Sequence, residues 1–357
     1  MGRHGDRQVT SRREILLALP ALAACATTGN GMSATPPLVI AHRGASGERP
    51  EHTLASYRLA IAQGADFIEP DLVFTKDGVL VCRHENEISG TTDVASRPEF
   101  ASRRTKKRVD FEDIEGWFTE DFTLAELKTL RCRERLPQLR PANAAFDGQE
   151  SIPTFEEVCA LAKAEGVGVY PETKHPTYFE TAGHVFDDAL LEALAHHGWR
   201  DASAPVFIQS FETTNLKRLR KRTALRLIQL ISDEGMPFDL LPSGMGLTYA
   251  DLVRGEGPKR LAAYVDGIGP FKGLIIPRDS AGRALAPTDL VARAHAAGLK
   301  VHPWTFRAEN YFLPAELRRG ESPAAHGDLD AELRQFYALG VDGVFADFPK
   351  IAVAAKS

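Results

Sequence analysis

The sequence predicts an α/β fold, and a TIM (β/α)8 barrel is preferred over an open parallel sheet. The first observation is that short apolar runs alternate with helical patterns over roughly 310 residues, without a linker midway. The second is that the alternation makes roughly eight strand–helix units, the number that a barrel needs. The third is that polar side chains follow the apolar runs, where the active sites of barrels lie. The chain has neither a Gly-x-Gly-x-x-Gly motif nor a P-loop, so nothing in it indicates a nucleotide-binding sheet.

Residues 1–25 are typical of an export signal. Their basic part ends in Ser11-Arg12-Arg13, which is similar to a twin-arginine motif. The apolar segment 15–24 follows, and it is too short to cross a bilayer as a helix. We therefore expect a periplasmic or cell-envelope location for the mature protein.

The signal ends in Leu22-Ala23-Ala24-Cys25, which is similar to a bacterial lipobox. We expect Cys25 to become the lipidated first residue of the mature protein, which would give the chain an N-terminal membrane anchor. The alternative is an ordinary signal that is cleaved after a small residue. Residues 26–36 are predicted to form a linker, and residues 37–357 the barrel domain.

The domain is predicted to open with a strand at Val39–Ala41 and a helix at Thr53–Gln63. Two strands follow, at Phe67–Leu72 and Val79–Arg83. The Lys76-Asp77-Gly78 between them is a hairpin signal, because Asp-Gly between apolar runs favours a tight turn.

Residues 86–145 break the alternation and are mostly polar. They contain the basic cluster Arg103–Arg108, which we interpret as a solvated loop rather than as a nucleic-acid site. A short helix is predicted at Phe122–Leu130. The whole chain has a formal net charge of −5, and residues 1–24 are net basic, so the mature protein has no global attraction for nucleic acid.

From Ile152 the alternation returns, and Thr154-x-x-Glu157 matches a capping box. Helices are predicted at 154–165, 179–197, 213–221, 288–297, 329–339 and 349–354. Strands are predicted at 167–170, 206–209, 225–231, 266–270, 300–305 and 343–346, and residues 232–257 are predicted to be irregular. Cys82 and Cys159 lie in apolar surroundings and are predicted to be buried free thiols.

Residues that can carry chemistry gather at the ends of the first three predicted strands. His42-Arg43 follows the first strand, Glu69-x-Asp71 lies in the second, and His84 follows the third. Side chains alternate along a strand, so Glu69 and Asp71 point the same way, and two carboxylates together suit a hard divalent cation. Two histidines suit proton transfer near neutral pH, and an arginine suits a phosphate.

Glu172 could add a third carboxylate from the end of a later strand. Oxygen ligands favour Mg²⁺, Ca²⁺ or Mn²⁺ over zinc. Lys174 lies two residues further on and shares the face of Glu172 if the strand persists. It could therefore contact a phosphate or the carboxylates.

The polar motifs, in chain order, are His42-Arg43-Gly44-Ala45, Pro50-Glu51-His52-Thr53, Glu69-x-Asp71, Lys76-Asp77-Gly78, His84, Tyr170-Pro171-Glu172-x-Lys174, His302-Pro303-Trp304-Thr305 and Asp347-Phe348-Pro349. The set resembles the glycerophosphodiester phosphodiesterase family, and in particular its periplasmic branch. The resemblance covers residues 37–354. Two positions depart from the usual pattern, because His52 stands in place of Asn and Glu85 follows His84 in place of Asp.

The resemblance implies a TIM barrel in which residues 86–145 are inserted after the early strands and help to cover the active site. It implies that three carboxylates bind a divalent cation, with Ca²⁺ expected before Mg²⁺ or Mn²⁺; they are Glu69, Asp71 and Glu172. His42 and His84 are the implied catalytic acid–base pair.

The implied substrate-binding residues are Arg43, Lys174 and Trp304. For Trp304, contact with the glycerol moiety and packing at the barrel rim are both open. Asp347 is expected to close the barrel rather than to take part in chemistry.

The implied reaction is hydrolysis of a glycerophosphodiester to sn-glycerol 3-phosphate and an alcohol. A hydroxyl of the substrate would attack first to give a cyclic phosphate, which water would then open. The expected partner is thus a small-molecule ester, with no nucleic acid and with a membrane contact only through the N-terminal anchor. The alternatives are a phosphodiesterase for lysophospholipids and a non-catalytic surface-binding lipoprotein. The second is disfavoured because a binding protein gains nothing from two proton-transfer histidines.

Overall fold

The computed structural model describes residues 36–241 and 246–357. The predicted export signal with Cys25, and the predicted linker up to residue 35, lie outside the described residues. Within the described ranges, no helix is both long enough and apolar enough to cross a membrane.

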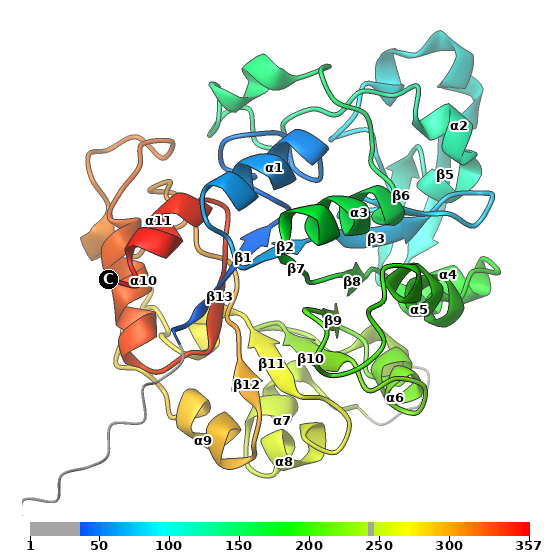
Figure 1. The fold of residues 1–357 in the computed structure, drawn as a ribbon. Helices are drawn as coiled ribbons and strands as arrows, with labels where there is room; N and C mark the ends of the chain where they lie inside the picture. Colours follow the sequence, from blue (N-terminus) through cyan, green and yellow to red (C-terminus); the bar gives the residue numbers. More distant parts are fainter. Residues whose placement is uncertain (1–35, 242–245) are drawn as a thin grey trace, which may run out of the picture. The chain divides into compact units, whose positions relative to one another are not determined.

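Parallel strands occupy eight positions around the centre of the described domain (Figure 1). In chain order they are β1 (Leu38–His42), β2 and β3 (Phe67–Glu69 and Asp71–Phe74), β7 and β8 (Gly168–Val169 and Glu172–Thr173), β9 (Phe207–Ser210), β10 (Arg226–Ile231), β11 (Gly267–Pro270), β12 (Lys300–Val301) and β13 (Gly343–Ala346). Pro70 interrupts the second position and Pro171 the third. Proline causes such breaks because it has no N–H to donate to a ladder.

Backbone hydrogen bonds link each strand position to the next one, and they also link the last position to the first. β1 pairs with β13 and β2, β2 with β7, β3 with β8, and the strands from β8 to β12 pair in chain order. Between the β12 and β13 positions, Asp342 N donates to Val301 O at 2.9 Å and Phe345 N to Pro303 O at 3.1 Å. This arrangement is the predicted α/β barrel.

The inside of the barrel is filled by large side chains. They form a buried cluster of their own: Ile40, Phe67, Tyr170, Phe207, Ile228 and Phe345. Residues one position away, such as Val39 and Ile68, belong to the larger core that lies against the helices, because side chains alternate along a strand. The barrel centre is therefore packed, and a ligand must bind at the strand ends.

Helices surround the strands (Figure 1). They are α1 (Leu54–Ala62), α3 (Phe155–Glu165), α4 (Pro176–Thr181), α5 (Phe186–His196), α6 (Thr214–Arg220), α7 (Tyr249–Val253), α8 (Gly257–Leu261), α9 (Leu290–Ala296), α10 (Leu329–Ala338) and α11 (Pro349–Ala354). The capping box predicted at Thr154 and Glu157 is present at the start of α3. Short 3-10 helices lie at Val94–Ser96, Pro98–Arg103, Thr119–Asp121, Asn143–Phe146, Phe238–Leu240, Lys272–Leu274 and Ala315–Leu317.

Two predictions about the helices were wrong. The single helix predicted at 179–197 is two helices, because Gly183 adopts a φ of +90° between α4 and α5. The segment 232–257, predicted to be irregular, contains α7, which begins with its own capping box at Thr248. A helix of five residues is too short to show a clear apolar period.

Residues 86–145 follow β4 (Leu80–Cys82), which pairs antiparallel with β3 as the hairpin signal predicted. They form the antiparallel pair β5 (Thr105–Val109) and β6 (Glu112–Gly116), and the helix α2 (Leu124–Leu127). The basic cluster was predicted to be a loop, and most of it is instead strand β5. The prediction failed because an exposed charged hairpin has no alternation of apolar and polar residues to reveal it.

The basic cluster is nevertheless solvated, and its charges are paired. Lys107 Nζ lies 2.9 Å from Glu120 and 2.8 Å from Asp121. The cysteines of the described residues are all buried free thiols, as predicted for Cys82 and Cys159.

Candidate active site

His42 is the last residue of β1, and a carboxylate from the far end of the chain holds its imidazole. His42 Nδ1 lies 2.7 Å from Oδ1 of Asp347, which follows β13. The second oxygen of Asp347 accepts hydrogen bonds from Arg140 Nη2 at 2.6 Å and from Arg307 Nε at 3.0 Å. The imidazole thus keeps Nε2 for a ligand in the cavity that His42 lines. Burial lowers the pKa of His42 to about 4, so the ring is neutral at pH 7.

His84 follows β4 and lines the same cavity. Its Nδ1 is hydrogen-bonded to the carboxylate of Glu85, and its Nε2 lies 3.3 Å from Lys174 Nζ. Glu85 accepts hydrogen bonds from Arg135 at 3.0 and 2.6 Å, so the longer side chain that replaces Asp still holds the ring. Burial and the neighbouring Arg43 lower the pKa of His84 to about 3.

Glu69, Asp71 and Glu172 form a buried acidic triad. One carboxylate oxygen of each lies within 4.8 Å of the other two. The strand register places Asp71 beside Glu172, and it places Glu69 beside His42. The side chains of Glu69 and Asp71 lie on the same side, as predicted, although Pro70 divides their strand into β2 and β3.

Nitrogen donors hold the triad from outside and fix its geometry. The contacts are Arg43 N to Glu69 at 2.8 Å, Gln209 Nε2 to Glu69 at 3.0 Å, His52 Nε2 to Asp71 at 2.9 Å, and Lys174 Nζ to Glu172 at 2.9 Å.

The electrostatics of the triad fit a bound cation. Burial, together with the charge of Asp71, raises the pKa of Glu69 well above its usual range. Burial raises the pKa of Glu172 to about 8, although Lys174 opposes the shift. Burial also opposes ionisation of Asp71, but His84 and Lys174 keep its pKa below the usual range. A divalent cation would offset this repulsion and ionise all three groups, and a site with only oxygen donors suits Ca²⁺, Mg²⁺ or Mn²⁺.

The predicted substrate-binding residues line the same cavity, whose volume is about 310 Å³. Arg43 has a φ of +60°, and its guanidinium lies 3.0 Å from Glu51. Lys174 reaches both Glu172 and His84. The indole N–H of Trp304 donates to the backbone carbonyl of Gly269 at 2.8 Å, and the ring lines the cavity. Trp304 therefore packs at the barrel rim and also faces the space where a ligand would bind.

Behind the cavity, residues that the sequence did not point to, or pointed to for another role, hold the site residues in place. Asp347 was expected only to close the barrel, although its place directly after the last strand puts it at the same edge as His42. His52 was not predicted as a site residue, yet it holds Asp71. Arg135 gave no signal at all, because it lies in residues 86–145, where no period shows which side chains face inward.

The fold and the site together define a TIM-barrel enzyme whose side chains at the strand ends suit the cleavage of a phosphoric diester. The chain belongs to the glycerophosphoryl diester phosphodiesterase family, whose sequence model matches residues 42–351. The members of this family are phosphoric diester hydrolases, and the prediction of an enzyme of this class is confirmed.

Curated relatives agree with this assignment. A glycerophosphodiester phosphodiesterase of Arabidopsis thaliana (GDPD6) is 38% identical over 87% of this chain and 84% of its own length. A glycerophosphodiester phosphodiesterase of Haemophilus influenzae is 31% identical over 95% of this chain and 96% of its own length.

Solved structures confirm the fold. A phosphodiesterase of Oleispira antarctica, solved in complex with the product sn-glycerol-3-phosphate, superposes with a TM-score of 0.58. It covers 90% of this chain and 96% of the other, at 24% identity, so the likeness concerns the fold.

Proposed function

We propose that this protein hydrolyses glycerophosphodiesters to sn-glycerol 3-phosphate and an alcohol, with a divalent cation and histidine acid–base catalysis. The observation that carries the proposal is that one cavity is lined by both histidines and by two residues of the acidic triad: His42, His84, Glu69 and Glu172. Family membership supplies the class of ester. The cavity supplies the groups that this chemistry needs.

Glu69, Asp71 and Glu172 are the residues that would hold the cation, with Ca²⁺ expected before Mg²⁺ or Mn²⁺. Bound there, the cation would stabilise the negative charge that develops on the phosphate as a P–O bond breaks. Arg43 and Lys174 supply further positive charge at the same place. Glu172 and Asp71 raise the pKa of Lys174 in spite of its burial, so the ammonium stays charged.

His42 and His84 would move the protons at their Nε2 atoms. In the first step a hydroxyl of the glycerol moiety attacks phosphorus and gives its proton to one imidazole. The other imidazole has to enter this step protonated at Nε2; it gives that proton to the departing alcohol, and a cyclic phosphate remains. In the second step water opens the ring with the two roles exchanged, so both imidazoles return to their starting states. A phosphate beside the rings favours protonation and thus opposes the lowering of their pKa by burial.

Gln209 and Trp304 would receive the glycerol moiety. Gln209 Oε1 is buried in the cavity wall and accepts no hydrogen bond from the described residues. It is therefore an acceptor for a substrate hydroxyl. Trp304 supplies a flat apolar face beside it.

The test is release of sn-glycerol 3-phosphate from glycerophosphocholine by the chain lacking residues 1–25. We expect EDTA to stop the release and one of Ca²⁺, Mg²⁺ or Mn²⁺ to restore it. His42→Ala should lower turnover at least 100-fold while cation binding, measured by calorimetry, stays within a few-fold. If EDTA does not reduce the release, the proposed requirement for a cation is wrong. If His42→Ala has activity close to wild type, the acid–base role of His42 is wrong.

We further propose that the protein is exported to the periplasm or cell envelope and anchored by a lipid on Cys25. The support is the sequence of residues 1–25 alone. Cys25→Ser should move the protein from the membrane fraction to the soluble fraction of the envelope. Unchanged fractionation would contradict the anchor while leaving the enzymatic proposal intact.

A further inference from the structure

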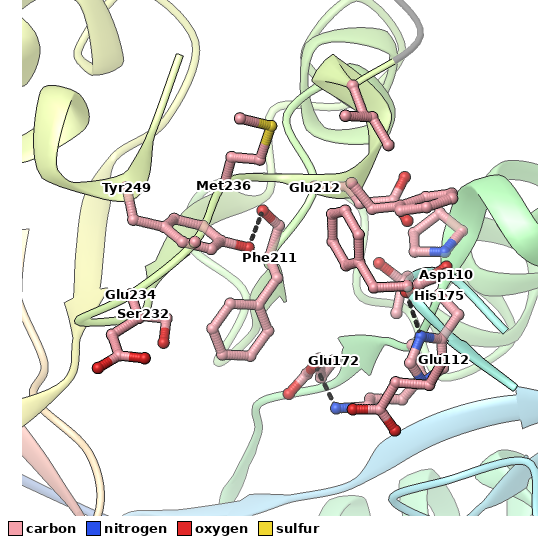
Figure 2. A pocket seen from close by; sticks show the side chains of 17 residues that line it. Asp110, Glu112, Glu172, His175, Phe211, Glu212, Ser232, Glu234, Met236 and Tyr249 are labelled. Carbon is pink, nitrogen blue, oxygen red and sulfur yellow. Dashed lines mark hydrogen bonds and ion pairs between the residues drawn. The ribbon is translucent and has the colours of Figure 1, made fainter. Parts of the chain in front are cut away.

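A cavity that is separate from the active site lies on the outside of the barrel. Its volume is about 560 Å³, and residues of α6, α7 and α8 and of the segments beside them line it. Figure 1 shows these three helices outside the strands. No described residue lines both this cavity and the catalytic one. A different cavity, of about 740 Å³, shares Glu172, Lys174 and Phe211 with the catalytic one and therefore belongs to the proposed active site (Figure 2).

The charged side chains that line the outer cavity are all basic. They are Lys217, Arg220, Lys221 and Arg260, and no aspartate or glutamate of the described chain is among the lining residues. The whole chain, by contrast, has a formal net charge of −5. The positive charge is therefore a local feature of this face, and charge of one sign around a cavity raises the local concentration of anions.

The helix α6 carries its basic residues on two faces, and one of the faces is neutralised. Arg218 and Arg222 lie four residues apart and so share a face. Arg218 forms ion pairs with Glu180 and Asp187, and Arg222 forms ion pairs with Asp187 and Asp188. These two arginines therefore have carboxylates enough for their charge.

The face of α6 toward the cavity lacks this neutralisation. Lys217, Arg220 and Lys221 share the face because they are three and four residues apart. Arg220 is paired with Asp266 at 2.7 Å. Lys217 Nζ contacts the hydroxyl of Thr213 at 3.2 Å, but neither it nor Lys221 forms an ion pair within the described ranges.

Arg260 adds a fourth positive charge from α8. It donates to the backbone carbonyl of Asp251 at 3.3 Å and has no ion pair among the residues that the structure describes. The carboxylate of Asp251 caps α7, where it accepts hydrogen bonds from Thr248 N at 2.9 Å and Thr248 Oγ1 at 2.6 Å. Lys217, Lys221 and Arg260 are all exposed, so three cations stand at the cavity without a carboxylate partner.

The rest of the cavity wall is mostly apolar. It contains Leu247, Leu252 and Leu261, of which the last two are buried. The hydroxyl of Tyr264 donates to Gln229 Oε1 at 3.0 Å, which ties this wall to strand β10. A ligand that carries both an anionic group and an apolar part would make use of the whole cavity.

We propose that this cavity binds the phosphate headgroup of an anionic phospholipid and thereby holds this face of the barrel against a membrane. Lysine and arginine near an anionic lipid surface each strengthen binding roughly fivefold. The exposed ammonium and guanidinium groups would contact the phosphate, and the leucines would contact the apolar part of the lipid next to it. The inference does not depend on the proposed reaction, because the cavity lies outside the catalytic site.

Other anions fit the cavity less well. Free inorganic phosphate would leave the leucines without a partner. A nucleic acid needs positive charge along an extended surface, and the adjoining face of α6 is bordered by Glu180, Asp187 and Asp188. A lipid on Cys25, as proposed above, would keep the domain close to a membrane, so that even a weak headgroup contact would be occupied.

The test is sedimentation of the chain lacking residues 1–25 with lipid vesicles. This chain contains every described residue and lacks the proposed anchor, so binding measures the domain alone. One set of vesicles contains phosphatidylglycerol and phosphatidylcholine in equal parts, and the other contains phosphatidylcholine only. With lipid in large excess, we expect the protein to bind the first set and not the second, and added salt should release it because salt screens exposed charges.

The cavity variant carries Lys217→Gln, Lys221→Gln and Arg260→Gln. Its partition onto the anionic vesicles should fall at least tenfold, because three of the cations that would contact the headgroup are lost. Its turnover of glycerophosphocholine and its circular dichroism should match the wild type, since none of the three residues lies in the catalytic cavity.

The matched control carries Arg104→Gln, Lys106→Gln and Arg108→Gln on the inserted hairpin. It removes the same charge from exposed residues that are already paired with Glu115 or Asp113. We expect it to bind the anionic vesicles nearly as well as the wild type does.

Equal binding of the wild type to the two sets of vesicles would overturn the proposal, and so would equal losses in the two variants. Calorimetry with inorganic phosphate covers the remaining case. If the wild type binds phosphate, the cavity variant loses that binding, and no vesicle binds, the cavity takes a soluble anion and the lipid assignment is wrong. None of these results bears on the release of sn-glycerol 3-phosphate, so the failure of this inference and that of the proposed function are distinguishable.

Discussion

Asp347 holds His42 as Glu85 holds His84, because each carboxylate is hydrogen-bonded to the Nδ1 of its ring and leaves Nε2 for the proton transfer that we propose. The two carboxylates reach their histidines by different routes. Glu85 is the next residue in the chain, whereas Asp347 is separated from His42 by 305 positions. Adjacency in sequence could predict the first pair, and only the folded barrel reveals the second.

Asp347→Asn should lower kcat on the order of 100-fold, because the amide no longer fixes the tautomer of His42 or stabilises its protonated ring. Asp347 raises the pKa of His42 against the effect of burial, so its loss should move the limb of the pH profile set by His42 to lower pH. The measurements are kcat, KM and their pH dependence, with circular dichroism to confirm folding. Asp330→Asn, a surface change, is the control. An unchanged pH profile with a lowered kcat would indicate a merely structural role.

At the scale of elements, strands β1, β2, β3 and β8 carry His42 and the three carboxylates of the proposed site, and residues 86–145 contact the site from outside. Arg135 lies in this segment and binds two carboxylates at once, Glu51 at 2.6 Å and Glu85 at 2.6 Å. Burial opposes the charge of Arg135, but Glu51 and Glu85 outweigh it and hold the pKa of Arg135 well above the usual range. Arg135 therefore links the start of α1 to the residue that holds His84.

Arg135→Ala should lower kcat/KM roughly tenfold by releasing Glu85 and with it His84. Arg133→Ala is the matched control, because Arg133 is exposed and lies only two residues away in the same segment. Steady-state kinetics on both variants checks the prediction. If the two substitutions have the same effect, residues 86–145 do not position His84 through Arg135.

The same elements show what could be predicted from sequence. The barrel strands were predictable because buried strands are short apolar runs. The grouping of the three carboxylates and both histidines was predictable because these residues lie within those runs or shortly after them. The resemblance to the family assigned roles to these residues, but it did not predict the positions of Arg135 or of the hairpin turn at Asp110. Those residues depend on how an irregular segment packs across the strand ends, and no local period encodes that packing.

At the scale of the whole domain, buried neutral histidines couple stability to pH. His302 lies in the barrel interior, where its Nδ1 is 2.8 Å from the hydroxyl of Tyr170. Burial lowers its pKa to about 3. Between that value and the unfolded value of about 6.5, the unfolded chain binds more protons than the folded one, so stability is lost as the pH falls.

His302→Asn keeps an acceptor near the Tyr170 hydroxyl but cannot titrate. On lowering the pH from 7 to 5, it should lose about 2 kcal/mol less of its unfolding free energy than the wild type loses. Urea denaturation at the two pH values measures the difference. His196→Asn, at an exposed histidine, should not change the slope. A wild-type slope in the His302 variant would show that His302 is not the titrating group.

The bond between His42 and Asp347 also sets the order in which folding can produce activity. This hydrogen bond joins the first and last strand positions. It cannot form until residues 42 and 347, which are 305 positions apart in the chain, have come together. A chain that has assembled every other strand still lacks a correctly oriented His42. During refolding, turnover should therefore recover later than the helical signal in circular dichroism. The return of activity would then mark the closure of the barrel.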